Sequence, residues 1–206
     1  MDYLIGFYNY TVWLTYFSLL SSVSGIFLAM SGHVRTAAVC LLVSGVCDMF
    51  DGKIARTKKD RTDDEKRFGI QIDSLCDIVC FGVFPAVLSA AAGADKWWQL
   101  AVAALFVLCG VIRLAYFNVT EETRQSKTDK KRESYAGLPI TASALFMPLL
   151  LCFAEPLGSA LPCACTALLA VMGICYIAPI KVRKPGLPGC VLFICLGLAA
   201  LVMLLV

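Results

Sequence analysis

Two stretches of the sequence, CDMFDGKIAR at residues 47–56 and FGIQIDSLCD at residues 68–77, place aspartates at the edges of long apolar runs. There are four of them: Asp48, Asp51, Asp73 and Asp77. A carboxylate is costly in sequence that is apolar enough to enter a membrane, so its presence there points to a function. The surrounding composition decides which solvent these side chains meet.

The composition is that of a membrane protein. The chain has 206 residues, of which 59% are hydrophobic and 16% are charged. Apolar blocks of about 18–24 residues are long enough to cross about 30 Å of hydrocarbon as helices. Such blocks lie at residues 12–31, 34–52, 70–93, 97–117, 138–154, 158–179 and 187–206. We therefore expect an all-α, polytopic membrane bundle with six or seven spans.

We expect a single integral-membrane domain over residues 1–206, because no repeat or flexible linker divides the chain. Residues 1–11 carry several aromatic rings, which prefer the membrane interface, and they lack the pattern of a cleavable signal peptide. They are interpreted as an interfacial lead. Six spans within residues 12–179 would form the core, and residues 187–206 would add a seventh.

The placement of basic residues predicts the topology. Three polar loops, at residues 53–67, 113–135 and 181–184, hold 16 of the 18 Lys and Arg residues. With seven spans and a cytoplasmic N-terminus, all three loops fall on one side, and Arg35 and Lys96 fall on the other. The positive-inside rule makes the loop-rich side cytoplasmic. The aspartates border these loops, so we expect them at the cytoplasmic face.

Other reactive residues are interpreted as structural. Asp60, Asp63, Asp64 and Glu65 are interpreted as caps and salt-bridge partners of the nearby Lys and Arg residues, because exposed mixed-charge runs are usually just solvated. No Cys/His pattern has the spacing of a zinc site, and the single histidine falls at a predicted loop. Several cysteines lie inside apolar runs and are expected to be small core residues. They are Cys109, Cys152, Cys175, Cys190 and Cys195.

Helical spacing brings the aspartates onto two polar stripes. Residues three, four, seven and eight apart share one face of a helix. The face that starts at Asp48 continues through Asp51, Gly52, Ala55 and Arg56. The face that starts at Gly69 continues through Asp73 and Asp77. If the two stripes face one another, four carboxylates converge on one site.

Converging carboxylates must either take up protons or hold cations. Hard oxygen ligands suit Mg²⁺ or Mn²⁺, and two such ions can bridge a pyrophosphate. The small residues on these faces let a ligand approach the backbone, and Arg56 can bind phosphate oxygens. The pattern therefore predicts displacement at phosphorus, supported by two metal ions. Two alternatives are that the aspartates are ordinary caps and salt-bridge partners, or that they form the cation path of a transporter.

The full pattern is Asp48-x2-Asp51-Gly52-x2-Ala55-Arg56 followed by Gly69-x3-Asp73-x3-Asp77, and it resembles the signature of the CDP-alcohol phosphotransferases. The resemblance covers most of the chain and implies a six-helix core. It implies a phospholipid-synthesising enzyme that transfers a phosphatidyl group from CDP-diacylglycerol to a hydroxyl acceptor and releases cytidine monophosphate. The implied setting is a prokaryotic cell membrane, with no nucleic-acid partner, and a homodimer would fit.

The resemblance also assigns residues by position. The four aspartates become ligands of a two-metal centre for Mg²⁺ or Mn²⁺, and Asp77 is in addition the general base. The pocket for the CDP group would include Asp51, Gly52, Ala55, Arg56 and Gly69.

Three further stretches resemble the phosphatidylserine synthase branch: DSLCDIVCFGVFPA at 73–86, RLAYFNV at 113–119 and YAGLPI at 135–140. This resemblance implies L-serine as the acceptor, with glycerol 3-phosphate or an inositol phosphate as the alternatives. Arg113 could bind the serine carboxylate or be a snorkelling anchor, and Asn118 could bind the acceptor or cap a helix.

The sequence departs from this branch at Cys80, Phe84 and Tyr116, and in a longer spacer between Arg56 and Gly69. Within the third span, Pro85 is expected to bend the helix, because proline lacks a backbone donor.

Overall fold

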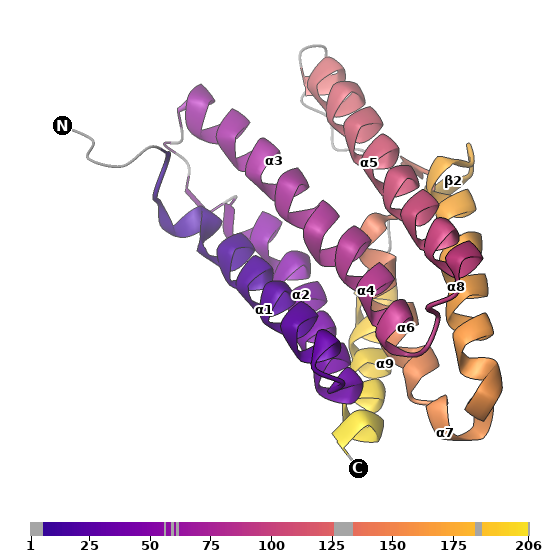
Figure 1. Ribbon diagram of the computed structural model, residues 1–206. Helices are drawn as coiled ribbons and strands as arrows, with labels where there is room; N and C mark the ends of the chain where they lie inside the picture. Colours follow the sequence, from indigo (N-terminus) through magenta and orange to yellow (C-terminus); the bar gives the residue numbers. More distant parts are fainter. Residues whose placement is uncertain are drawn as a thin grey trace.

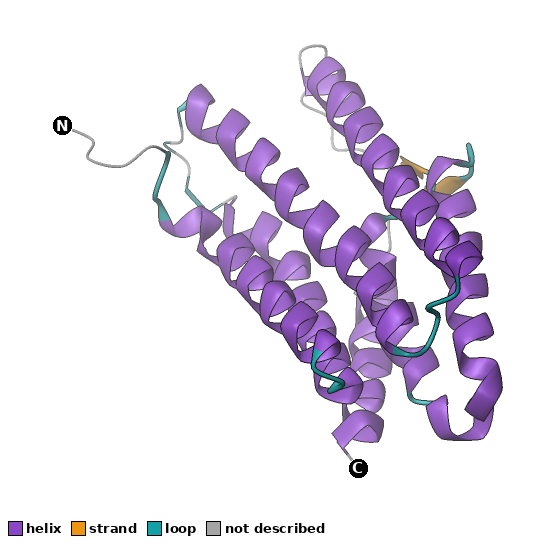
Figure 2. Cartoon of the chain, in the orientation of Figure 1, coloured by secondary structure: helices purple, strands orange, loops and turns teal. Residues whose placement is uncertain are grey.

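A computed structural model describes residues 6–55, 57–58, 60, 62–125, 134–183 and 187–205. These residues form a helical bundle (Figures 1 and 2). Its helices are α1 (Trp13–Met30), α2 (Val34–Ala55), α3 (Asp63–Asp77), α4 (Phe84–Ala91), α5 (Trp97–Gln125), α6 (Ser143–Leu151), α7 (Ala154–Leu157), α8 (Leu161–Ile177) and α9 (Leu187–Leu205). Single 3₁₀ turns at Tyr10–Val12, Ile140–Ala142 and Gly158–Ala160 extend α1, α6 and α7, and a π-helical segment at Ile78–Val83 joins α3 to α4.

Among the described residues, four helical stretches are long and apolar enough to cross a membrane, namely Tyr10–Met30, Asp63–Ala91, Trp97–Glu122 and Ala154–Ile177. Two shorter apolar helices accompany them, Ile140–Leu151 and Phe193–Leu204. α2 is also long, at 22 residues, but it carries four charged side chains: Arg35, Asp48, Asp51 and Lys53. The protein is therefore an integral multi-pass membrane protein, which confirms the predicted polytopic bundle.

The block at 138–154 differs from the prediction. Its helix covers Ile140–Leu151 and then breaks into a turn. At 1.5 Å per residue, this helix is about 18 Å long, which is shorter than the hydrocarbon core. Hydropathy alone could not locate the break, because the residues on both sides of it are apolar.

Small residues let α1 and α2 pack closely. The buried residues of α1 recur at helical spacing and include Ser18, Ser22 and Gly25. The hydroxyl of Ser22 lies 2.8 Å from that of Ser44 on α2, and Ser18 donates to the Ser44 carbonyl at 3.2 Å. A Cβ atom on Gly25 would lie 2.2 Å from Cζ of Phe84, so only glycine fits there. Close packing through small and hydroxyl residues is common between membrane helices.

The third helix continues through Pro85. The chain remains helical from α3 into α4, but the segment Ile78–Val83 widens to a π-helix just before the proline. Because Pro85 has no N–H group, it cannot bond the carbonyl of Phe81 four residues earlier. That carbonyl instead accepts a hydrogen bond from the hydroxyl of Ser143 on α6, at 2.8 Å. The lost backbone bond is thus replaced by a side chain from a neighbouring helix.

One short sheet modifies the all-α prediction. Residues Ser134–Ala136 (β1) pair antiparallel with Lys181–Arg183 (β2), with Tyr135 opposite Val182. The following residue, Gly137, has φ of +80°, and its N–H group donates to the carbonyl of Ile180 at 2.7 Å. The ladder therefore ties the connection before α6 to the connection after α8.

The bundle has two distinct ends (Figure 1). The segment before α1, the start of α3, the end of α5 and the β-ladder lie at one end. The α1–α2 turn, α7 and the end of α9 lie at the other end. Arg35 and Glu155 form an exposed ion pair of 2.5 Å between α2 and α7.

The cysteines only partly follow the prediction. Cys109, Cys152 and Cys175 are partly buried, but Cys195 is exposed, and the side chain of Cys190 lies outside the described residues. All ten cysteines whose side chains are described are free thiols. An exposed cysteine on an apolar helix faces the surface that lipid would cover, which the hydrophobic pattern alone does not distinguish from the core.

Candidate active site

The candidate site lies where α1, α2 and α3 meet, at the end of the bundle that holds the segment before α1. α2 ends at Ala55, and α3 begins after Thr62. Thr62 and Glu65 form a capping box, in which each side chain accepts a hydrogen bond from the backbone N–H of the other, and this fixes the start of α3. A cleft of about 280 Å³ opens between these elements. It is lined by Thr11, Val12, Thr15, Asp51, Gly52, Ala55, Lys66, Gly69, Ile70 and Asp73.

The cleft brings together most of the residues assigned to the CDP pocket. Asp51, Gly52 and Ala55 come from the last turn of α2, and Gly69 comes from the second turn of α3. The fifth assigned residue, Arg56, lies outside the described residues. The two small glycines and the alanine border a space that a nucleotide could enter.

An acidic cluster adjoins the cleft. It consists of Asp48, Asp73 and Asp77, whose ligand oxygens lie within 4.8 Å of one another. Asp51 lies close enough to Asp48 and Asp73 to interact with them electrostatically. Asp51 also accepts a long hydrogen bond of 3.4 Å from the hydroxyl of Thr15. Asp73 belongs to both features, since it lines the cleft and is part of the cluster.

The donor set of this cluster fits a hard divalent cation. Three partly buried carboxylates at this separation repel one another unless they bind protons or a cation. Oxygen ligands of this kind are those that Mg²⁺ and Mn²⁺ prefer. The cluster can therefore hold a metal ion, with its oxygens next to the wall of the cleft.

Sequence reasoning missed part of the cleft wall. Thr11 and Val12 come from the 3₁₀ turn before α1 and Thr15 from the start of α1, where the sequence indicates only an interfacial lead and the beginning of a span. Lys66 and Ile70 also line the cleft, and no motif in the sequence marks them. Thr15 and Asp51 lie on different helices, so no local pattern in the sequence could indicate the contact between them.

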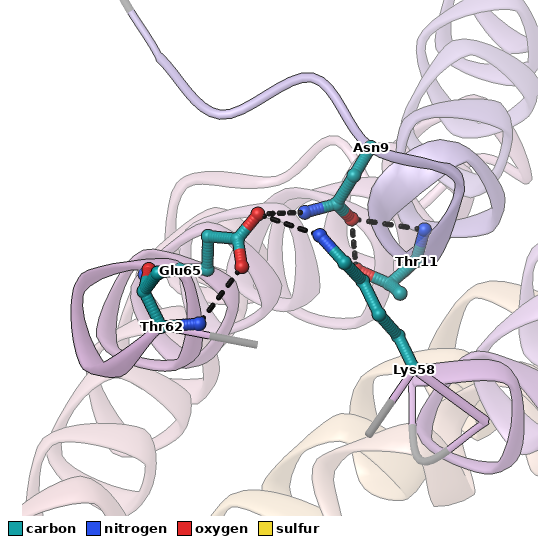
Figure 3. Close-up of polar contacts among 5 residues, drawn as sticks. All are labelled: Asn9, Thr11, Lys58, Thr62 and Glu65. Atoms are coloured by element: carbon teal, nitrogen blue, oxygen red, sulfur yellow. Dashed lines mark hydrogen bonds and ion pairs between the residues drawn. The ribbon is translucent and has the colours of Figure 1, made fainter. Parts of the chain in front are cut away.

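The interpretation of Glu65 as a cap and salt-bridge partner is confirmed. Its side chain is only 15% exposed and forms an ion pair of 2.8 Å with Lys58. It also accepts hydrogen bonds from the side chain of Asn9 and from the N–H of Thr62 (Figure 3). The spacing Thr62-x-x-Glu65 is a capping-box signature, so the sequence did contain a signal for part of this role. Asp60, Asp63 and Asp64 are exposed, as expected.

The two candidate acceptor residues lie outside the cleft wall. Arg113 is buried, at 7% exposure, and its Nε donates to the carbonyl of Leu138 at 3.1 Å, so it is not a snorkelling anchor. Asn118 lies well inside α5 and therefore does not cap that helix. Its amide instead exchanges hydrogen bonds of 2.9 and 3.0 Å with the hydroxyl of Ser74, the neighbour of Asp73 on α3.

The departures from the phosphatidylserine synthase pattern also lie away from the described cleft wall. Cys80 and Phe84 are buried in the helix packing, where Cys80 accepts a hydrogen bond of 3.8 Å from Ser18. Tyr116 is exposed on the surface of α5. These substitutions change packing rather than the lining of the cleft.

Comparison with known proteins agrees with this geometry. Residues 8–204 match the model of the CDP-alcohol phosphatidyltransferase family. The archaetidylserine synthase of Methanothermobacter thermautotrophicus is 36% identical over 132 residues, which cover 62% of this chain and 52% of that protein. The CDP-diacylglycerol–serine O-phosphatidyltransferase of Helicobacter pylori is 34% identical over 134 residues, covering 64% of this chain and 52% of that protein.

The enzyme of the same name from Saccharomyces cerevisiae is 33% identical over 150 residues, covering 66% of this chain and 52% of that protein. This chain thus spans about half the length of the curated relatives it matches. The family match, in contrast, covers nearly the whole chain and includes both helices that carry the aspartates. The chain belongs to the CDP-alcohol phosphatidyltransferase family.

Proposed function

We propose that this protein transfers the phosphatidyl group of CDP-diacylglycerol to the hydroxyl of L-serine, giving phosphatidylserine and cytidine monophosphate. The observation that carries the proposal is the junction of the cleft with the acidic cluster through Asp73. A nucleotide in the cleft would have its pyrophosphate beside carboxylates that can hold divalent cations. Membership of the family supports the same reaction class.

In this proposal, Asp48, Asp51, Asp73 and Asp77 would hold two Mg²⁺ or Mn²⁺ ions. Bound divalent cations would supply positive charge to the pyrophosphate and to the departing cytidine monophosphate. Gly52, Ala55 and Gly69 would let the CDP group approach the backbone, and Arg56 would bind phosphate oxygens.

Asp77 is proposed as the general base. As the acceptor hydroxyl oxygen bonds to the β-phosphorus, its proton passes to the Asp77 carboxylate. The bond from the β-phosphorus to the oxygen of the cytidine monophosphate breaks at the same centre. Asp77 is part of the acidic cluster but is not among the described residues that line the cleft, which is consistent with a role in chemistry rather than in nucleotide binding.

L-serine is proposed as the acceptor because similar relatives carry names of serine-using or archaetidylserine-forming enzymes. Arg113 would pair with the serine carboxylate, and Asn118 would contribute a hydrogen bond. Asn118 is tied to Ser74, which directly follows Asp73. Glycerol 3-phosphate and inositol phosphates are the competing acceptors.

The membrane arrangement is proposed to contain one catalytic domain over residues 1–206. Residues 1–11 would form the interfacial lead, 12–179 a six-span core and 187–206 a seventh span, with the active site at the cytoplasmic face of a prokaryotic cell membrane. Support comes from the arrangement of the bundle, in which the segment before α1 and the end of α9 lie at opposite ends (Figure 1).

In the test, purified protein is incubated with CDP-diacylglycerol, Mg²⁺ and one labelled acceptor at a time. The acceptors are L-serine, glycerol 3-phosphate and an inositol phosphate. We expect labelled phosphatidylserine and an equal amount of cytidine monophosphate only with serine. A labelled product with another acceptor would overturn the serine assignment and retain the transfer chemistry. Cation flux into liposomes without any lipid product would favour the transporter alternative instead.

A further inference from the structure

A group of polar side chains lies beside the cleft and joins three segments of the chain. We call it the Glu65 cluster, and Figure 3 shows its members. It contains residues from the segment before α1, from the connection between α2 and α3, and from the start of α3: Asn9, Thr11, Lys58, Thr62 and Glu65.

The carboxylate of Glu65 is the centre of this cluster. Oε1 accepts from Nδ2 of Asn9 at 3.1 Å and from Nζ of Lys58 at 2.8 Å. Oε2 accepts from the backbone N–H of Thr62 at 2.9 Å. One carboxylate therefore contacts donors from all three segments. The hydrogen bond from Lys58 to Glu65 raises the pKa of Lys58 above its ordinary value, which keeps this partner positively charged.

The cluster connects directly to the cleft wall. Oδ1 of Asn9 accepts hydrogen bonds from both the N–H and the hydroxyl of Thr11, and the first of these measures 3.1 Å. Thr11 lines the cleft, as does Lys66, the residue that follows Glu65. The orientation of Thr11 therefore depends on Asn9, and the position of Asn9 depends on Glu65.

Two further contacts join the same segments. The hydroxyls of Tyr10 and Thr57 lie 3.1 Å apart, and the rings of Phe7 and Phe68 meet edge to face with their centroids 5.4 Å apart. These contacts are peripheral, because neither pair lines the cleft among the described residues. Among the described residues of these three segments, no strand pairs the one before α1 with the other two, and the contacts above show side chains holding it in place.

We propose that Glu65 is a positioning residue for the CDP-binding cleft, and that its carboxylate holds the segment before α1 and the α2–α3 connection against the start of α3. This inference rests on the proposed function, because it assigns the cleft to the CDP group. Glu65 itself does not line the cleft, so it acts through Asn9 and Thr11. The longer spacer between Arg56 and Gly69 provides both Lys58 and the capping box of α3.

The test uses two variants and one matched control. Glu65→Gln keeps an oxygen for the capping box but removes the negative charge that pairs with Lys58. Asn9→Ala removes the tie to Thr11 and leaves α3 intact. The control, Asp64→Asn, removes the same charge from the same first turn of α3, but at an exposed position. All three retain the aspartates of the site.

For Glu65→Gln and Asn9→Ala, we expect the KM for CDP-diacylglycerol to rise about tenfold, since each loses a charge-assisted contact that fixes the wall. Their kcat should change by less than about twofold, because the reacting groups are untouched. In both variants the backbone amides of residues 6–12 should also exchange with deuterium faster than in the wild type. Asp64→Asn should match the wild type in both measurements.

The hydrogen-exchange measurement does not need turnover. The positioning role of Glu65 can therefore be refuted independently of the proposed function. If the wild-type protein never released cytidine monophosphate, the proposed function would be refuted. Faster hydrogen exchange in the variants would still support the contacts made through Glu65. Unchanged exchange and an unchanged KM in Asn9→Ala would overturn the positioning role. A kcat that falls while KM stays constant would overturn it as well. If Glu65→Gln folded poorly, the measurements on Asn9→Ala would still be sufficient to support or refute the positioning role.

Discussion

The Asp77→Asn substitution distinguishes the role of the acidic cluster from the role of the cleft. The change preserves the shape of the side chain and removes one negative charge from the cluster. The ligand oxygens of Asp77 lie within 4.8 Å of those of Asp48 and Asp73. At an effective dielectric constant of about 20, two unit charges at that distance repel by about 3.5 kcal/mol. Asp77 has two such neighbours, so the substitution would remove about 7 kcal/mol of repulsion from the metal-free protein when all three carboxylates are ionised. Protons bound to the cluster make this gain in stability smaller but do not change its sign.

We therefore expect metal-free Asp77→Asn to unfold at a higher temperature than the metal-free wild type. Turnover should fall by about 10²- to 10⁴-fold, because the amide cannot accept the proton of the acceptor. Binding of CDP-diacylglycerol at saturating Mg²⁺ should change little, since Asp77 is not among the described residues that line the cleft. Thermal unfolding followed by tryptophan fluorescence in detergent, a lipid-binding titration and release of cytidine monophosphate measure these three quantities.

The comparison variant is Asp51→Asn. Asp51 lines the cleft, so this change should weaken the binding of CDP-diacylglycerol as well as turnover. The reasoning would be refuted if Asp77→Asn unfolded at a lower temperature than the wild type without metal and retained turnover within about tenfold. Such a result would mean that Asp77 neither repels its neighbours nor takes part in the reaction.

Three further predictions follow from other parts of the molecule. Arg113→Ala should raise the KM for serine by about 30-fold or more with little change for CDP-diacylglycerol, and an unaltered serine KM would reduce Arg113 to a tie between helices. Gly25→Ala should lower the unfolding temperature, because its Cβ would overlap the buried ring of Phe84 and overpacking costs about 1–3 kcal/mol; an unchanged temperature would show that α4 yields. A tag at Ser126, which lies outside the described residues, should be cytoplasmic and a C-terminal tag external, whereas protection of both tags on one side would exclude seven spans.

The sequence was sufficient for the features that depend on local periodicity and hydropathy. The long apolar helices follow from block length, and helical spacing places Asp48 on one polar stripe and Asp73 and Asp77 on another. That the two stripes face one another is shown by the structure. The structure brings three of the four aspartates into one cluster and leaves Asp51 at the cleft wall, bonded to Thr15. Their roles as metal ligands and base remain predictions.

What could not be predicted depends on contacts between distant segments. The hydroxyl of Ser143 replaces the hydrogen bond lost at Pro85, across 62 residues of sequence between Ser143 and Phe81. Asn9 and Glu65, which form a hydrogen bond, are likewise 56 residues apart in the sequence. In both cases a polar group finds its partner only after the helices have packed, so neither hydropathy nor spacing contains the information.

The most direct test of the central claim measures release of cytidine monophosphate from CDP-diacylglycerol by purified protein, in EDTA and after addition of Mg²⁺ or Mn²⁺, with L-serine present. The claim is that the acidic cluster and the cleft form one cation-dependent centre joined through Asp73. We expect no release in EDTA, full release on adding either cation, and no recovery by either cation in Asp73→Asn. Undiminished release in excess EDTA after exhaustive removal of metal, or wild-type activity of Asp73→Asn, would contradict the claim.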